Sequence, residues 1–525
     1  MKMLYISEIC KNSSFGEISR KYIEMFKKYC NIDIHLLNIN NTISYIDQEI
    51  IECKNIKKIN FLPDYYLNEN NKEQVKLYLI GFFHISEYII NLQPDIVIML
   101  FYDNDIKLIQ ELIETIKPQW KGLFIPLFTI NYINLPLKML DSNYDGCIFT
   151  NKISMNEVKN KTKNKFPAYY CPHIVNGFSS LSHEEKIKLR KKIHGENSNK
   201  YIIGWINSNN SRKRLDLVIT AFIKFYKYYP NSILYIKTTK SRVCLNTTCY
   251  YNIEKVKYDY PIQINSEYLN NTRLNELYNT FNIMINATDG EGFGLTPFEA
   301  ALCNVLTILP NNTSYKSLIT NNEIPNYLIP CKQYPYMYAR TTTDIIKRIE
   351  GNELFSIYYD FKSYENKLSY SENFIPLIHE NIKGVTTFIL SKKLEPDYNV
   401  VFSDIKGILD SNWDVLQIQF LITSDLETVR YMLFWLKDNT EYTWPGKNRN
   451  RLLLKISSLQ DFVGYENPTV GLINIEDMVI KMIYYYKNYD QYQKDVLCLK
   501  NYVLNNFSDL AVSKHFNNII NKLES

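Results

Sequence analysis

The chain has 525 residues and a formal net charge of +5 at pH 7, and 46% of its residues are hydrophobic while 22% are charged. These proportions are typical of a globular protein and exclude wholesale disorder. A charge this small on a 62.2 kDa chain does not indicate a nucleic-acid-binding surface, so we expect no nucleic-acid partner. At about 150 residues per domain, the length predicts several structural units.

No stretch reads as a leader or a membrane span. The first eight residues become charged too early for a secretory signal, and the longest apolar stretch, 78–101, is interrupted by residues such as His84 and Asp95. The ten cysteines show no regular spacing, so we interpret them as reduced; a zinc site at Cys244 and Cys249 is the weaker alternative. We therefore expect a cytoplasmic protein, for which peripheral membrane contact stays open.

Strand-like and helix-like segments alternate through the first third of the chain. A helix is predicted over residues 18–29, where apolar side chains recur at helical spacing. The small residues around Gly16 suit the preceding strand-to-helix turn. Such alternation predicts an open parallel sheet, with ligands bound at the carboxyl ends of its strands. The strands are expected at 3–6, 33–37, 96–100, 123–128 and 147–150.

A second alternating series follows a break near residues 172–177. A charged helix at 184–192 and a polar link at 195–200 lead to a strand at 201–206 and a helix with an apolar face from Leu215 to Tyr229. This series predicts a second Rossmann-like unit, joined to the first by a linker. Its further strands are expected at 233–236, 283–286 and 305–309.

The stretch 326–465 continues neither series, and we expect it to be an insertion of unknown role. Its basic cluster, Lys447 to Arg451, reads as a solvated face rather than as a contact with an acceptor or a membrane. Helical character returns at 475–486 and 511–523. The predicted domains are therefore 1–175, 196–325 together with 466–500, the insertion 326–465, and closing helices at 501–525 that can pack back on the N-terminal domain.

The window 286–300, NATDGEGFGLTPFEA, carries the clearest chemical pattern. Gly290, Gly292 and Gly294 remove side chains where backbone N–H groups can approach a ligand closely. A helix predicted to open at Thr296 places its positive N-terminus directly behind them, which favours an anion such as a diphosphate. The window therefore predicts a phosphate-bearing ligand.

Glu291 and Glu299 add two carboxylates, each able to accept both hydroxyls of a cis-diol in a sugar or ribose. Thr296 to Glu299 also reads as a capping box with no ligand, but this alternative leaves Glu291 unexplained. The glycine spacing is wrong for a dinucleotide fingerprint, and no P-loop sequence occurs.

This window resembles the signature of the group 1 (family 4) retaining glycosyltransferases, in which two Glu residues stand with seven residues between them. Segments 172–176, 207–222, 311–314 and 471–473 agree in order and place. The resemblance covers about 1–320 and 466–525. It implies the GT-B architecture, an α/β fold with two Rossmann-like domains facing across a cleft, here with an extra inserted region in the C-terminal half.

The resemblance also implies roles for individual residues. Glu299 would hold the ribose hydroxyls of a nucleotide-diphosphate sugar, Glu291 would contact the donor sugar near the reacting carbon, and Lys213 would neutralise the diphosphate. Gly16 would mark the N-terminal loop that faces the donor. The backbone expected to bind sugar and phosphate is that of Gly292, Phe293, Gly294 and Leu295. The implied reaction moves the sugar to an acceptor hydroxyl with retention, without a metal or cofactor.

Some positions depart from the family pattern. Ser208 stands where the family often has Arg, and we assign the second cation to Arg212 ahead of Arg214. A D-x-D triplet at 103–105 reads as a solvated turn rather than a metal motif, and His173 as a hydrogen-bonding residue of the linker. The acceptor stays open among a glycan, a protein and a lipid. Two alternatives remain: a non-catalytic sugar- or nucleotide-binding scaffold, and a nucleotide-sugar epimerase.

Overall fold

The computed structural model describes most of both predicted series and the C-terminal helices. The described residues are 1–7, 14–30, 32–41, 56–61, 84–102, 106–133, 135, 140, 143–208, 211–238, 260–319, 322–335 and 469–524. They form two compact units. The first comprises Met1–Gly177, Glu291–Glu299 and Leu499–Ser525, and the second comprises Phe178–Gly290 and Ala300–Cys498.

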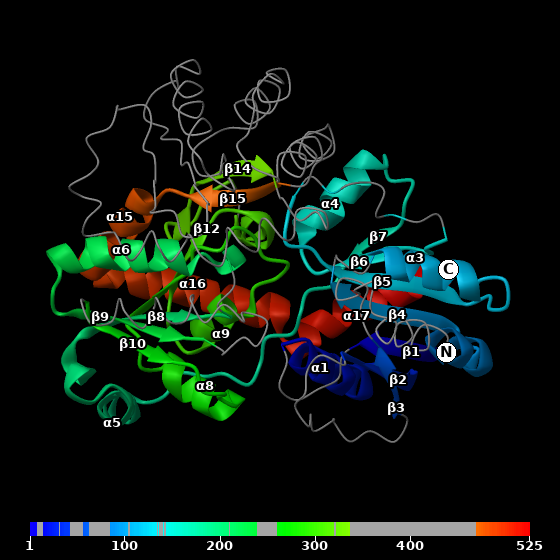
Figure 1. Ribbon diagram of the computed structural model, residues 1–525, viewed down its shortest axis with the longest axis horizontal. Coiled ribbons are helices and arrows are strands. Elements are labelled where there is room, and N and C mark those ends of the chain that lie inside the picture. The colour runs from blue at the N-terminus through cyan, green and yellow to red at the C-terminus, as the bar shows by residue number, and fades with distance from the viewer. Residues whose placement is uncertain are drawn as a thin grey trace, which may run out of the picture. The chain divides into compact units, whose positions relative to one another are not determined.

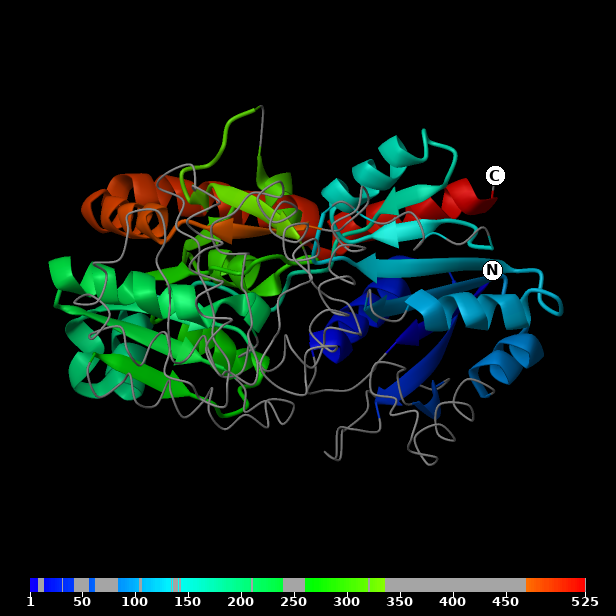
Figure 2. The same cartoon turned by 45° about the horizontal axis from the view of Figure 1, so that its top comes forward.

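The first unit is built on a seven-stranded parallel sheet with the order β3-β2-β1-β4-β5-β6-β7 (Figure 1). Adjacent strands β4 and β5 pair from Ile96 opposite Leu123 to Tyr102 opposite Thr129 and can be followed in Figure 2. The strands are β1 (Lys2–Ser7), β2 (Asp33–Asn41), β3 (Ile56–Phe61), β4 (Ile96–Tyr102), β5 (Leu123–Thr129), β6 (Cys147–Phe149) and β7 (Ala168–Tyr170).

Helices α1 (Ser14–Tyr29) and α17 (Asp509–Glu524) pack together in the first unit, although they come from opposite ends of the chain (Figure 1). The ring centroids of Phe26 and Phe516 lie 4.5 Å apart, and both side chains are buried beside Tyr5 of β1. The same unit holds a helix at 84–92, α3 (Ile106–Ile116) and α4 (Lys152–Lys161). The apolar face predicted over 18–29 is therefore part of the core.

The second unit contains a six-stranded parallel sheet with the order β10-β9-β8-β11-β12-β13. Its strands are β8 (Tyr201–Ile206), β9 (Ser232–Lys237), β10 (Ile262–Asn265), β11 (Ile283–Ile285), β12 (Thr307–Pro310) and β13 (Leu328–Ile329). An antiparallel pair, β14 (Cys331–Pro335) with β15 (Thr469–Ile473), accompanies it. In both sheets the order reverses beside the first strand, which is the doubly wound pattern. The predicted α/β class with two Rossmann-like units is confirmed.

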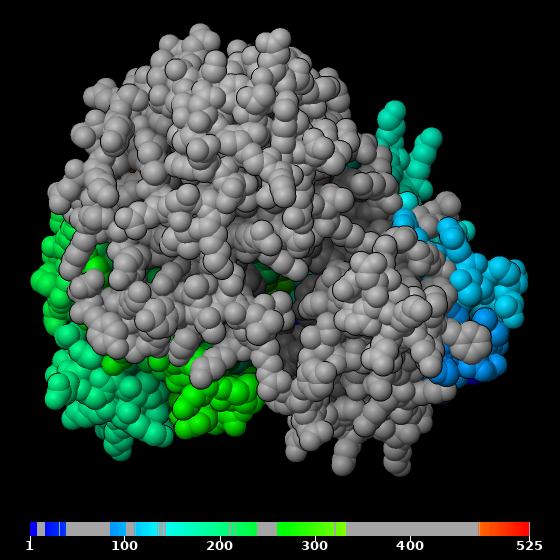
Figure 3. Space-filling model, viewed as in Figure 1, coloured from blue at the N-terminus to red at the C-terminus, as the bar shows by residue number. Residues whose placement is uncertain are grey.

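Two helices of the second unit pack against each other, and a third is largely exposed to solvent. Lys224 of α6 (Leu215–Tyr228) and Glu476 of α15 (Ile475–Lys487) form an ion pair, and the ring of Tyr229, directly after α6, lies 4.1 Å from that of Tyr486 on α15. Helix α5 (His183–His194) is largely exposed and, with α8 (Asn271–Tyr278), can be found in the space-filling view of Figure 3.

The chain also forms α9 (Leu295–Leu302) and α16 (Tyr489–Phe507), each of which crosses the division between the units in the sequence, and the short helices η4 (Gly195–Asn199), η5 (Ser211–Lys213) and η6 (Thr313–Leu318). Strands β13 and β14 fall at the start of the range that we assigned to the insertion. Among the described residues, no helix has the length and apolar character needed to cross a membrane.

Candidate functional site

Two loops of the second unit bind each other where the strand order of its sheet reverses. One follows β8 and contains η5, and the other follows β11; the two strands are neighbours. The carbonyl of Arg212 accepts hydrogen bonds from the backbone N–H of Asp289 at 2.9 Å and from Thr288 Oγ1 at 3.1 Å. The Arg212 guanidinium donates to the carbonyl of Gly290, which directly precedes Glu291. Ligands of doubly wound sheets bind at this switch point.

The cations of η5 and its flank have different surroundings. Arg214 adopts a left-handed backbone conformation with φ of 48°, is buried, and forms an ion pair with Asp289 at 3.5 Å. Lys213 is half-buried, whereas Ser208 is exposed. The assignment of Arg212 ahead of Arg214 stays a prediction, and the buried pair with Asp289 gives Arg214 a structural role at the start of α6.

The Asn312 side chain contacts two other backbone segments of the second unit, residues 288–289 and Gly471. Its Nδ2 lies 3.0 Å from the carbonyl oxygen of Thr288, 2.9 Å from that of Asp289 and 3.1 Å from that of Gly471. The side chain is fully buried, and the Gly471 N–H also donates to Asp289 O, at 2.8 Å. Sequence reasoning included this residue only within a matching segment, because its partners are remote along the chain.

Asn312→Ala is expected to lower the free energy of unfolding by about 3 kcal/mol, because each buried acceptor that loses its donor costs roughly 1–3 kcal/mol. Urea unfolding of wild type and variant measures the difference. The control is Asn488→Ala. In wild type the exposed Nδ2 of Asn488 donates to Tyr484 O, and loss of this hydrogen bond is expected to lower the free energy of unfolding by less than about 0.5 kcal/mol. Equal losses in the two variants would contradict the role given to Asn312.

The segment Glu291–Glu299 belongs to the first unit. Gly292 is bound on both sides of its backbone: its N–H donates to Asn131 Oδ1 at 2.9 Å, and its carbonyl accepts from Thr150 Oγ1 and Asn151 Nδ2, each at 3.0 Å. A Cβ at Gly292 would lie 2.2 Å from Thr129 Cγ2, so glycine is needed for this close approach. The N–H that was predicted to bind the donor is thus engaged with Asn131.

Both predicted carboxylates are buried: Glu291 is 5% exposed and Glu299 is 7% exposed. Buried glutamates are uncommon in proteins, and these two flank the glycine turn that the sequence singled out. Gly294 has φ of 79° and permits the turn into α9, which begins at Leu295 rather than at Thr296. Thr296 is thus the second residue of the helix, and the capping box stays an alternative for Thr296 and Glu299.

An aromatic cluster, made of Phe293, Phe298, Phe507 and His173, packs against the same segment. The Phe293 ring centroid lies 5.2 Å from that of His173, 5.3 Å from that of Phe298 and 4.9 Å from that of Phe507. The linker is tied to the cluster because the N–H of Val175 donates to Phe507 O at 2.8 Å. Phe293 is therefore an apolar anchor of the segment.

His173 lies in the linker with both ring nitrogens near hydroxyls, Nδ1 at 3.4 Å from Tyr22 and Nε2 at 3.3 Å from Thr129. Burial, assisted by the positive charge of Lys21, lowers its pKa from 6.5 to about 3. The imidazole is therefore neutral throughout the physiological range, as expected for a hydrogen-bonding residue of the linker.

Because the pKa of His173 is depressed in the folded state, acid destabilises the protein through this residue. Below pH 6.5 the unfolded chain takes up a proton that the folded chain does not, so the free energy of unfolding falls until about pH 3. The contribution between pH 7 and pH 5 is about 2 kcal/mol. Urea unfolding at both pH values should show that His173→Gln has a smaller acid loss than wild type, whereas the exposed His183→Gln variant keeps it. An unchanged loss in His173→Gln would contradict this account.

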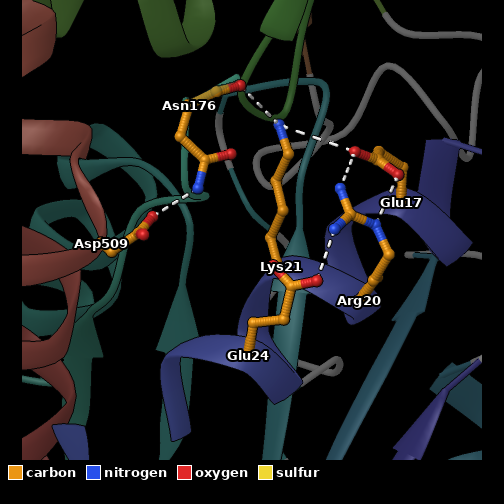
Figure 4. A network of polar contacts seen from close by, with 6 residues as sticks. All are labelled: Glu17, Arg20, Lys21, Glu24, Asn176 and Asp509. Atoms are coloured by element: carbon orange, nitrogen blue, oxygen red, sulfur yellow. Dashed lines mark hydrogen bonds and ion pairs between the residues drawn. The ribbon is translucent and has the colours of Figure 1, made fainter. Parts of the chain in front are cut away.

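A polar network next to the predicted N-terminal loop connects α1, the linker and the start of α17 (Figure 4). Buried Lys21 places Nζ 3.4 Å from Asn176 O and 4.0 Å from the carboxylate of Glu17. Asn176 Nδ2 donates to Asp509 Oδ1 at 2.6 Å. Gly16 is buried in the first turns of α1, one residue before Glu17. The prediction of a loop at Gly16 is therefore wrong, because the helix begins at Ser14 and already includes this residue.

Several other predicted features lie outside the described residues: the D-x-D triplet at 103–105, the cysteines at 244 and 249, and the basic cluster 447–451. His84 is described, with Nδ1 3.8 Å from a carboxylate oxygen of Glu87 on the same helix. Within the described ranges, no group of three or more His, Cys, Asp and Glu side chains is arranged to hold a metal ion.

Residues 186–353 match the family model of the glycosyl transferases group 1. The match covers about a third of the chain and makes this part of it similar to that family. The resemblance inferred from the double-Glu window is confirmed there, since the group 1 segment includes η5, Glu291 and Glu299. No curated protein sequence matches the chain significantly.

Several solved structures resemble this protein at low sequence identity. Sucrose-phosphate synthase from Thermosynechococcus elongatus is 12% identical with a TM-score of 0.47, over 71% of this chain and 100% of the other. Anabaena HepE in complex with UDP and glucose is 10% identical with a TM-score of 0.45, over 71% and 100%. A structure described as trehalose-6-phosphate from E. coli bound with UDP-2-fluoro glucose is 12% identical with a TM-score of 0.43, over 59% and 84%.

Proposed function

We propose that the protein transfers a sugar from a nucleotide-diphosphate sugar to an acceptor hydroxyl, with retention and without a metal. The observation that carries the proposal is the buried carboxylate pair, Glu291 and Glu299, flanking a glycine turn inside a segment that is similar to the group 1 glycosyltransferases. The turn itself requires neither glutamate, since Gly294 alone supplies its left-handed residue.

We assign a separate role in the reaction to each of the two glutamates. Glu299, in α9, accepts the ribose hydroxyls of the donor, and Glu291 contacts the donor sugar near the carbon that is transferred. Departure of the nucleoside diphosphate develops negative charge, which a cation and the N-terminus of a helix stabilise without a metal. Lys213 and the start of α9 are assigned these two roles. The leaving phosphate accepts the proton of the acceptor, so no protein nucleophile is assigned.

A second candidate function is binding without transfer. Ser208, which is exposed, stands where the family often has Arg, and a missing cation would weaken stabilisation of the leaving group. In that case the protein would bind a nucleotide sugar and Glu291→Ala would leave binding unchanged. An epimerase differs from both candidates because it converts a nucleotide sugar without any acceptor.

The test incubates the full chain with UDP-, GDP-, ADP- and TDP-sugars, with and without EDTA and with simple glycans as acceptors. Release of a nucleoside diphosphate with formation of a glycoside of unchanged anomeric configuration, insensitive to EDTA, is the expected result. Conversion of the donor sugar without an acceptor would indicate the epimerase. Donor binding with no turnover would leave the binding scaffold.

A further inference from the structure

Three polar side chains, each from a residue just after strand β5 or β6, bind Gly292, which directly follows Glu291. We propose that Asn131, Thr150 and Asn151, here called the Gly292 clamp, are positioning residues that set the Glu291 carboxylate for sugar transfer. The inference rests on the proposed function of Glu291 and assigns a part in it to the carboxyl edge of the first sheet.

The clamp satisfies both backbone polar groups of Gly292. Asn131, two residues after β5, accepts the N–H at 2.9 Å. Thr150 directly follows β6, and Asn151 directly precedes α4; each donates to the carbonyl at 3.0 Å. The two peptide groups that flank the Gly292 Cα are thus both bound, and the residue packs against Thr129 at a distance that leaves no room for a Cβ.

Two clamp residues are placed by other features of the fold. Thr150 is 1% exposed, and Asn151 is 3% exposed and caps α4 by accepting the N–H of Ser154 at 2.8 Å. Capping uses only Oδ1, so Nδ2 of Asn151 is available to Gly292 without cost to the helix. The donor group of Asn151 is thus pre-oriented by a bond that has no connection with the Glu291 segment.

Gly292 and Glu291 share a peptide group, through which the clamp can affect the position of the Glu291 carboxylate. The peptide group between Glu291 and Gly292 includes the N–H that Asn131 accepts, so rotation of that group moves the Glu291 side chain with it. Displacement of a reacting group by about 1 Å costs roughly 100-fold in rate. The clamp is therefore expected to affect turnover far more than donor affinity, which depends on Glu299 in the following helix.

The experiment compares variants that remove the donors with variants that keep them. Asn151→Asp keeps the acceptor that caps α4 but removes the donor to Gly292, and Thr150→Val removes the other donor at nearly constant volume. Thr150→Ser keeps its hydroxyl. Thr162→Val is the control, because it deletes a threonine hydroxyl that donates to a backbone carbonyl, Val158 O at 2.8 Å, elsewhere in the first unit.

The double variant Thr150→Val/Asn151→Asp is expected to lower kcat about 10- to 100-fold, with the donor KM changed less than about twofold. Thr150→Ser and Thr162→Val are expected to keep kcat within about twofold of wild type. An active wild type with unchanged kcat in the double variant would overturn the clamp alone, as would equal losses in Thr150→Ser and Thr150→Val. A wild type inactive with every donor would overturn the proposed function and the clamp with it.

Discussion

Glu291→Gln is expected to lower kcat by about 100- to 1,000-fold, the loss typical of removing one group that stabilises charge in a transition state. The substitution keeps the size and shape of the side chain, removes its charge and replaces one acceptor oxygen by an NH2 donor. Since Glu291 is buried, its carboxylate acts in surroundings where electrostatic interactions are stronger than in water. The donor KM should change much less, because the ribose is assigned to Glu299.

Steady-state kinetics with the active donor measure this split between kcat and KM. Glu196→Gln is a matched control: Glu196 is an exposed residue of η4, and its replacement should leave both constants unchanged. A kcat of Glu291→Gln within threefold of wild type would remove Glu291 from the site. Equal losses in kcat and affinity would instead assign Glu291 to donor binding.

Lys213→Ala is the second large effect, with an expected loss of about 100-fold in kcat and a smaller loss of donor affinity. A cation at the diphosphate is needed most when the leaving group carries its full charge, so its removal raises the barrier more than it weakens the bound ground state. Lys213→Arg keeps a positive charge and should recover part of the rate.

Lys227→Ala is the control for this variant, because Lys227 is an exposed residue in the last turn of α6. Its kcat should equal that of wild type. If Lys213→Ala lost donor affinity and kcat by the same factor, Lys213 would contribute uniform binding and no stabilisation specific to the transition state.

The central strands were the elements that the sequence predicted best. The strand expected at 201–206 is β8, Tyr201–Ile206, because an uninterrupted apolar run marks a strand that is buried on both faces. The missed strands are β3, β7, β10, β13, β14 and β15. The first three lie at or next to sheet edges or are only three or four residues long, and β13 has two residues, so their patterns are too short or too polar to predict.

The glycine turn and the helix start of the window around Glu291 were also predicted from the sequence, and the role of its two carboxylates stays a prediction. The residues that bind this window from other parts of the chain were not predicted. Asn131, Thr150 and Asn151 are 161, 142 and 141 residues away from Gly292, and no local pattern marks an ordinary Asn or Thr as its partner. The α9 start at Leu295 depends on the turn at Gly294, whereas the sequence offered Thr296 as an equally good cap.

The most direct test of a nucleotide-sugar site is a thermal-shift titration of wild type and Glu299→Ala with UDP-, GDP-, ADP- and TDP-sugars, with and without EDTA. A ligand that binds only the native state must raise the unfolding midpoint. We expect one donor to raise the midpoint of wild type regardless of EDTA, and Glu299→Ala to lose most of that rise. No rise with any donor, or the same rise in both proteins, would contradict the account.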